Sequence, residues 1–349
     1  MKFNKFIIFI LIVFLKTGNV LSDNNIFNVN NIEIEKKGKT TNDELANRAI
    51  KKGFSQLIRK ILLDEDHKKL SELKFSQIKE LMMYYQVTRN NENVNNIVEK
   101  INFNIFFDKD KIHNLFYQKN ISYSEISNKE LFLLPILKKK NKIYIFNQNF
   151  FYDQWNKIAK DTLIEFILPQ ENIEIIQNVN LKKNILLDLE LSNILKEYSE
   201  KNLALVLIED NGFNEEKIYF KVRILGKNII KNINIKRNNL GEDEFYKNII
   251  FKVKKEIINL IKSQNLIDIR TPSFLNAEFI TGKKNSLVEL NLRLKKIDLV
   301  EDIYIQQFNN KTVYLKLKYL GKLNKIIKQL QDQNIILKLT DNQWTIKII

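Results

Sequence analysis

Residues 203–208 read Leu-Ala-Leu-Val-Leu-Ile, an uninterrupted apolar run. A run of this length is short for a buried helix but typical of a strand that is covered on both faces. Alternating apolar residues follow at Ile218–Ile224 and at Ile229–Ile235, with Gly226 between them at the position of a turn. Phe245–Ile261 then has the spacing of a long amphipathic helix. This part therefore predicts a buried strand, a hairpin and a covering helix.

Upstream of this run, short apolar strands alternate with helical patterns. Strands are predicted at Leu131–Leu137, Ile143–Phe146 and Leu163–Leu168, the last closed by Pro169, and helices at Phe150–Lys160 and Ile185–Tyr198. Such alternation is typical of a mixed sheet with helices on one or both faces. We assign residues 126–264 to one mixed-sheet α/β module.

Residues 23–125 predict an N-terminal α+β module. Phe27, Val29, Ile32 and Ile34 alternate as in a strand with a bulge at Asn30–Asn31. Thr41 followed by Glu44 is a helix-capping pair. A helix at Phe75–Met82, strands at Tyr85–Val87 and Val94–Phe107, and a helix at Asp108–Tyr117 complete the module.

Residues 273–349 predict a third module. Strands at 275–280, 303–308, 313–319 and 335–339, with helices at 287–297 and 323–330, give the order β-α-β-β-α-β, followed by a terminal strand at 344–348. This order is typical of the ferredoxin-like fold. The expected fold class is therefore α+β, with three small α/β-sandwich-like modules of which the last is ferredoxin-like.

The first 22 residues have the three parts of a secretory signal peptide. Lys2 and Lys5 precede the apolar run Phe6–Leu15, and Val20 and Ser22 precede a cleavage point before Asp23. Ten apolar residues are fewer than the roughly 20 that span a bilayer. We expect export to the periplasm; the alternative is an uncleaved inner-membrane anchor formed by residues 6–15.

Composition restricts the chemistry and the partners. The chain has no cysteine, so disulfides and thiolate ligands are excluded. Its formal net charge is +16, but 50 of its 57 basic residues are Lys and 7 are Arg. The fork-shaped donors that read phosphates and base edges are therefore scarce. We predict no nucleic-acid partner, and regard the anionic membrane surface as the more plausible target of this charge.

Several residues also resemble a known family. They are Phe27-x-Val29-x-x-Ile32-x-Ile34, Ala46, Arg48, Ala49, Leu133-Leu134-Pro135, Trp155 and Leu168-Pro169. In this order the region from Ile26 to Ile261 resembles the bacterial domain of unknown function 2066, which is exported in proteobacteria and has no established activity. Tyr319-x-Gly321 and Trp344 resemble the tail of alphaproteobacterial members. The middle module is also similar in topology to the α/β domain that opens the periplasmic Tol-system propeller protein.

Motifs for catalysis or metal binding are weak. The two histidines, His67 in a charged loop and His113 on a helix, are expected to be surface or packing residues. Asp108 and Asp110 lack the further ligands of a calcium loop and fit a helix N-terminus. The pair Gly282-Lys283 lacks the spacing of a phosphate loop, and Met82–Tyr85 is expected to be core. We predict no metal and no cofactor.

The densest polar and aromatic cluster contains Asp153 and Trp155, with Glu171 nearby. Trp155 could offer a platform for a sugar or peptide, or could anchor its helix on the sheet while Asp153 faces water. The expected function is a non-catalytic envelope adaptor or assembly factor that binds envelope proteins, not an enzyme. The alternative is a small-ligand, glycan or peptide binding protein with a site near Trp155. A third reading, an enzyme, requires Asp153 and Glu171 to converge as a pair.

These readings predict different surfaces. An adaptor predicts an exposed apolar edge or patch. A binding protein predicts a deep cleft with aromatic residues, and a hydrolase predicts two converging carboxylates.

Overall fold

The computed structural model describes residues 25–349 except 37, 90–98, 127–128, 159–162, 183–184, 189, 282–285, 310–311 and 341. The predicted signal segment and most of the Gly282-Lys283 turn lie outside these residues. The chain forms two compact units, one made of residues up to Tyr123 together with Ile267–Ile349, the other of Ser124–Leu266. The first and third predicted modules thus fall in unit 1, and the second corresponds to unit 2. Both units are mixed α and β.

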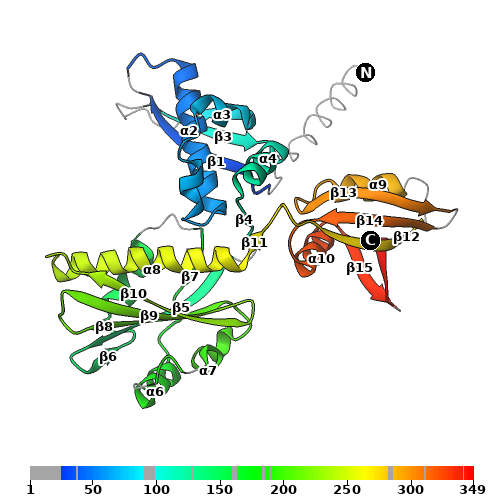
Figure 1. Cartoon of the computed structure of the whole chain (residues 1–349). Helices are drawn as coiled ribbons and strands as arrows, with labels where there is room; N and C mark the ends of the chain where they lie inside the picture. Colours follow the sequence, from blue (N-terminus) through cyan, green and yellow to red (C-terminus); the bar gives the residue numbers. More distant parts are fainter. Residues whose placement is uncertain are drawn as a thin grey trace, which may run out of the picture. The chain divides into compact units, whose positions relative to one another are not determined.

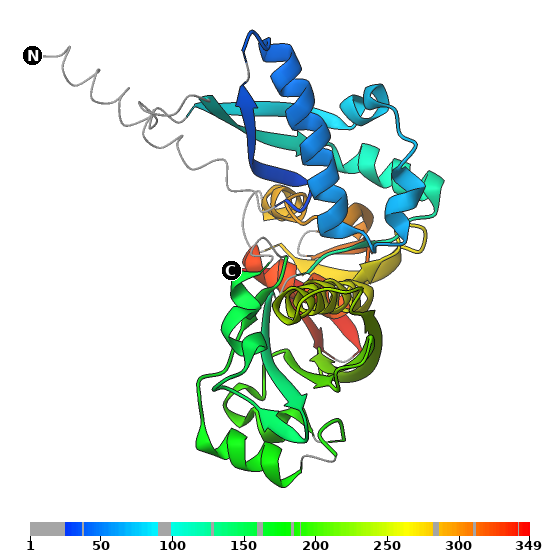
Figure 2. The ribbon, with the colours of Figure 1, turned by 90° about the vertical axis from the view of Figure 1, so that its left-hand side faces the viewer.

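The N-terminal part of unit 1 is a three-stranded antiparallel sheet covered by helix α2 (Figure 2). Its strands are β1 (Asn28–Lys36), β2 (Met82–Arg89) and β3 (Glu99–Phe107), in the order β1-β3-β2. The other elements are α2 (Asn42–Ile61), a 3-10 helix at Asp66–Leu70, α3 (Phe75–Glu80) and α4 (Lys109–Lys119). The bulge between Val29 and Ile32 and the reciprocal Thr41–Glu44 cap are confirmed.

Helix α2 approaches its sheet closely at Gly53. A Cβ at this position would lie 2.7 Å from Ile32 Cδ1 and 3.1 Å from Ile105 Cγ1. Glycine therefore sets how near α2 can pack, because the interior has no room for another carbon.

Met82–Tyr85 was expected to be core, and this prediction is wrong. These residues begin β2, an edge strand, and Met83 is 62% exposed, with Tyr84 and Tyr85 each 40% exposed. A register shift between Met82 and Tyr84 also turns the strand at this point. The apolar run signals a strand, but the sequence does not show that the strand lies at an edge.

The C-terminal part of unit 1 is a five-stranded sheet. Its elements are β12 (Ser273–Ile280), α9 (Ser286–Leu294), β13 (Val300–Phe308), β14 (Thr312–Tyr319), α10 (Leu323–Asp332), β15 (Ile335–Thr340) and β16 (Gln343–Ile348). The strand order is β13-β14-β12-β16-β15. The ferredoxin-like arrangement is not confirmed. It requires antiparallel strands on both sides of β12. β14 is antiparallel to β12 on one side, but β16 pairs with β12 in parallel on the other side, and β15 lies beyond β16.

Unit 2 is built on a six-stranded sheet. Its strands are β5 (Glu130–Lys139), β6 (Lys142–Tyr144), β7 (Glu165–Ile167), β8 (Leu203–Asp210), β9 (Glu215–Ile224) and β10 (Lys227–Lys236). The order is β10-β9-β8-β5-β6, and β7 also pairs with β5. β5 is parallel to β7 and β8, while β8, β9 and β10 are antiparallel. The predicted hairpin across Gly226 is confirmed, with Leu225 and Gly226 both at positive φ.

Helices cover both faces of this sheet (Figure 1). α5 (Phe150–Gln154) and the long α8 (Glu242–Gln264) pack on one face, and α6 (Ile173–Leu181) and α7 (Leu191–Ile194) on the other. β4 (Tyr123–Ser124) and β11 (Leu266–Ile267) form a small sheet where the chain passes between the units.

Two helix predictions in unit 2 need correction. The helix expected at Phe150–Lys160 ends at Gln154 and continues as a 3-10 turn, Trp155–Lys157. The helix expected at Ile185–Tyr198 is reduced to α7 and a second 3-10 turn, Lys196–Tyr198. Helix α6 was not predicted, although Asn172 caps it by accepting a hydrogen bond from the Glu174 amide.

Candidate functional site

The carboxyl ends of β5 and β8 form the point in unit 2 where the chain reverses its direction across the sheet. The connection from β5 to β7 carries α5 on one face, and that from β7 to β8 carries α6 and α7 on the other. β7 and β8 thus flank β5 from opposite sides. Ligands of doubly wound sheets bind at such switch points. Here the paired residues Lys139 and Asp210 end the two strands.

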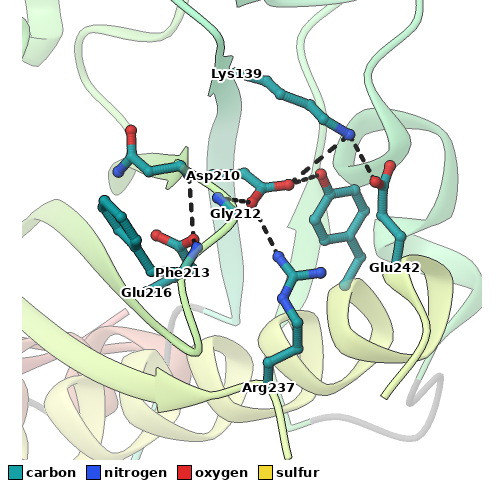
Figure 3. A network of polar contacts seen from close by, with 9 residues as sticks. Lys139, Asp210, Gly212, Phe213, Glu216, Arg237 and Glu242 are labelled. Carbon is teal, nitrogen blue, oxygen red and sulfur yellow. Dashed lines mark hydrogen bonds and ion pairs between the residues drawn. The ribbon is translucent and has the colours of Figure 1, made fainter. Parts of the chain in front are cut away.

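Asp210 is the centre of a buried polar network at this point (Figure 3). Its Oδ1 accepts hydrogen bonds from Arg237 Nη2 at 2.9 Å and from the Gly212 amide at 3.1 Å. Its Oδ2 accepts from the Tyr246 hydroxyl at 2.5 Å and lies 3.9 Å from Lys139 Nζ. Both oxygens are engaged, so the buried charge is compensated by two cations and two neutral donors.

A second carboxylate completes the network. Glu216 accepts hydrogen bonds from the amides of Asn211 and Phe213, at 3.1 and 2.6 Å, and so fixes the loop between β8 and β9 (Figure 3). Burial, together with Asp210, raises the pKa of Tyr246 above its usual range, so this hydroxyl remains a donor. The arrangement clamps the loop and the start of α8 in place.

A cavity of about 390 Å³ lies beside this polar network. It is lined by Lys139, Lys140, Lys142, Tyr144, Phe150 and Tyr246, and also by Glu242 and Asp243 at the start of α8. Lys139 Nζ lies 2.6 Å from Glu242 Oε2, so part of its charge is already balanced. Lysines beside aromatic rings can hold a small anionic group.

Trp155 is not accessible as a stacking platform for a sugar or peptide. Trp155 has no exposed surface and packs edge-on against Phe166, with ring centroids 6.1 Å apart, in the core beneath α8. Asp153 is exposed. Trp155 therefore anchors its turn on the sheet, which was the packing interpretation of this cluster.

Tyr152, rather than Trp155, lies near the two predicted carboxylates. It packs on the opposite face of the sheet, T-shaped against Phe146, and donates from its hydroxyl to the Pro169 carbonyl at 2.8 Å. Burial and the charges of Glu171 and Asp153 raise the pKa of Tyr152. Glu171 is exposed and accepts a hydrogen bond from Asn147 at 3.0 Å. The sequence showed the cluster but not which aromatic residue would face it.

The histidines lie apart in the chain and have different roles. His113 is buried between the rings of Phe27 and Tyr123, and its Nδ1 lies 3.4 Å from Glu301 Oε1. Its assignment as a packing residue is confirmed. His67 is half-buried in the 3-10 helix at Asp66–Leu70, so the charged loop expected there is a helical turn, in which Asp66 is buried and Lys68 and Lys69 are exposed. Within the residues described, no three His, Cys, Asp or Glu side chains gather as a metal site.

Lys254 is a buried lysine that the sequence did not single out. It lies on α8, donates to the Ile158 carbonyl at 2.8 Å and lies 5.2 Å from the centroid of Phe166. Burial lowers its pKa to about 8. In the sequence it is indistinguishable from the surface lysines of the same helix.

β2, at the edge of the N-terminal sheet, exposes the apolar side chains of Met83, Tyr84, Tyr85 and Val87. Among the described strands β2 pairs with β3 alone, so its other side has unpaired backbone groups. A mostly apolar groove of about 440 Å³ lies beside it, lined by Asn42, Leu45, Tyr85, Val87, Ile101 and Phe103. An exposed apolar edge of this kind is typical of a strand that receives a partner.

Comparisons with other proteins add little to this geometry. The chain matches no protein-family model and no curated protein. Among solved structures it is similar to one described as "Crystal structure of uncharacterized protein", at 11% identity over 40% of this chain and 94% of that chain, with a TM-score of 0.19. A similarity at this level carries no argument about fold or function.

The described helices were also compared with the length and hydropathy that a bilayer requires. None of them is both long and apolar enough to span a membrane.

Proposed function

We propose that this protein is a non-catalytic adaptor or assembly factor of the cell envelope, exported to the periplasm, that binds an extended segment of a partner polypeptide at β2. The observation that carries the proposal is the apolar edge strand with a groove beside it. The signal-like segment at residues 1–22 supports the location.

Strand addition explains how β2 can recognise a partner. An added strand forms main-chain hydrogen bonds with the free edge, and alternate side chains enter the neighbouring groove. Tyr85 and Val87 are registered with Ile105 and Phe103, so they lie on the groove side. Tyr84 lies on the other side and stacks on Phe106, with centroids 4.4 Å apart. The geometry fits a segment with apolar residues at alternate positions.

Photo-crosslinking in the native envelope tests this proposal. A photoreactive residue at position 87 on β2 is compared with one at position 230 on β10, an edge strand of unit 2 with similar exposure. The expected result is one discrete crosslinked protein from position 87, which disappears in a Tyr85→Lys background, and none from position 230. Equal or diffuse crosslinks from both positions contradict the proposal.

A second candidate function is the binding of a small anionic ligand in the cavity at the switch point of unit 2. The lysines there favour it, and this site replaces the one expected near Trp155. Titration calorimetry with inorganic phosphate and with succinate tests it, using Lys142→Gln as the variant and Lys227→Gln as a control with the same charge change. Binding that Lys142→Gln leaves unchanged excludes this cavity as the site.

A further inference from the structure

Within the residues that the structure describes, the helices that cover the five-stranded sheet of unit 1, α9 and α10, lie on the same face of it. On β12 the residues toward α9 and α10 are Leu275, Ala277 and Phe279, and all three are buried. Their neighbours along the strand, Phe274, Asn276, Glu278 and Ile280, point to the opposite side of the sheet because side chains alternate. Phe274, Asn276 and Ile280 are exposed. We call this side of the sheet the open face.

The strand registers identify the other residues of the open face. Lys318 and Lys316 of β14 pair with Phe274 and Asn276. Lys338 of β15 pairs with Thr345, and Lys347 of β16 with Ile336, on the same side. Asp302 and Tyr304 of β13 lie opposite Lys318 and Lys316. The residues named on this face include four lysines and two acids, Asp302 and Glu278, and a third acid, Glu301 of β13, lies near Lys318.

Lysines and apolar groups are interleaved on this face. Lys316 Nζ lies 4.6 Å from the centroid of the Phe274 ring. Tyr304 is exposed, and its hydroxyl is hydrogen-bonded to Asp302. Ile280 and Ile336 are exposed aliphatic side chains. Lysine stems can lie along apolar surface while their ammonium groups reach outward.

We propose that the open face binds the surface of a bilayer that contains anionic phospholipids. Ammonium groups meet the lipid phosphates, and each lysine near an anionic surface strengthens binding roughly fivefold. Aromatic and aliphatic side chains between the lysines enter the headgroup layer, where amphipathic side chains are favoured. This inference uses a different surface from β2 and does not depend on the proposed adaptor function.

The same face fits single-stranded nucleic acid less well. Bases stack on free aromatic ring faces and on arginine planes. Here one ring is covered by Lys316, the Tyr304 hydroxyl is tied to Asp302, and the residues named on the open face include no arginine. Point charges with aliphatic neighbours favour a lipid headgroup layer over a strand of bases.

Vesicle flotation tests the proposal, with the chain that starts at Asp23. The vesicles contain 30% phosphatidylglycerol in phosphatidylethanolamine, or phosphatidylcholine alone, in roughly 0.1 M salt. The expected result is binding to the first kind and none to the second. Changing Lys316, Lys318, Lys338 and Lys347 to Gln should weaken binding at least tenfold.

A matched control removes the same charge from the helical side of the sheet. Lys295 and Lys296 follow α9, Lys322 precedes α10 and Lys328 lies on it, and all four are exposed. Changing these four to Gln should alter binding less than twofold. Equal losses in the two variants, or no binding by the unchanged protein, overturn the proposal.

Two further measurements test whether misfolding causes the loss of binding and whether nucleic acid binds the open face instead. Lys338→Glu with Lys347→Glu changes only exposed positions and should also abolish flotation while the circular dichroism spectrum and Tm stay unchanged. If this folded variant still floats, the proposal is wrong. Tighter binding to a fluorescent oligothymidylate than to the anionic vesicles would assign the face to nucleic acid instead.

Discussion

Two edge strands, β10 of unit 2 and β2 of unit 1, differ in the number of charged residues that they carry. Ile230 on β10 is 55% exposed and Val87 on β2 is 48% exposed. β10, however, carries Lys227, Lys231 and Lys236 among asparagines, and Lys231 pairs with Glu256 at 2.6 Å. Charged residues, lysine above all, prevent another strand from pairing at an edge.

β2 has no such protection over most of its length. Its first seven residues, Met-Met-Tyr-Tyr-Gln-Val-Thr, carry no charge. The β10 edge is therefore protected against pairing with another strand, and the β2 edge is not.

A similar contrast separates the buried network at Asp210 from the groove at β2. At Asp210, donors and acceptors are matched within the chain, whereas at β2 apolar side chains are left exposed. Substitutions at Asp210 should lower the free energy of unfolding, and substitutions at β2 should weaken partner binding.

The largest effect is expected at Asp210. Asp210→Ala leaves the charge of Arg237 and the hydroxyl of Tyr246 without their buried acceptor. It should lower the free energy of unfolding of unit 2 by about 3–5 kcal/mol. Glu209→Ala is the control next to it, because its ion pair with Lys138 is partly exposed and should contribute at most about 1 kcal/mol. Urea unfolding measures both; similar losses contradict the matched network.

A smaller effect is expected where α2 meets its sheet. Gly53→Val forces side-chain atoms against Ile32 and Ile105 and should cost about 1–3 kcal/mol. Gly241→Ala is the control, since nothing lies within 4 Å of a Cβ there and its φ is −59°. Thermal unfolding of the two variants measures the difference. An unchanged Tm for Gly53→Val would contradict close packing of α2 on the sheet. It would mean that this face, like the β2 edge, has room for additional side-chain atoms.

The next effect depends on pH. The hydrogen bond from His113, with the charges of Lys109 and Lys318, lowers the pKa of Glu301 from its ordinary value of 4.5. Ionised Glu301 therefore stabilises unit 1 above pH 4.5, and this stabilisation is lost as the pH falls through the lowered value. Glu301→Gln should be less stable than wild type at pH 6, with a difference that narrows below pH 4.5. A difference independent of pH rules out the carboxylate as its source.

The smallest effect on stability is expected at β2. Val87→Lys changes an exposed position and should alter the free energy of unfolding by less than about 0.5 kcal/mol. It should nevertheless remove partner binding, because it places a charge on the groove side of the edge. Ile230→Lys should change neither quantity. Loss of more than about 2 kcal/mol in Val87→Lys would show that β2 is covered by the chain itself.

The sequence predicted the elements whose pattern is local. The bulge at Asn30–Asn31, the Thr41–Glu44 cap and the hairpin at Gly226 depend on neighbouring residues, and all are present. The order of strands in the C-terminal sheet was not predictable in this way. Whether β15 or β16 pairs with β12 depends on contacts between residues far apart in sequence.

The candidate sites show the same limit. Asp210, Arg237 and Tyr246 come from β8, the end of β10 and α8, and no spacing in the sequence connects them. Trp155 was singled out because it lies in the densest polar and aromatic cluster of the sequence, but an aromatic residue in such a cluster can pack in the core as readily as at the surface. The exposure of β2 follows from its place at the sheet edge, which only the assembled sheet defines.

Hydrogen exchange of the β2 amides tests the central claim most directly. The crosslinked partner, or a peptide with the sequence of its crosslinked segment, is added at saturating concentration, and exchange is followed over 82–89 and 227–236. The account predicts slower exchange at 82–89 and no change at 227–236, because an added strand would bond to the free β2 backbone. Unchanged exchange at 82–89, with protection elsewhere in the chain, would contradict it.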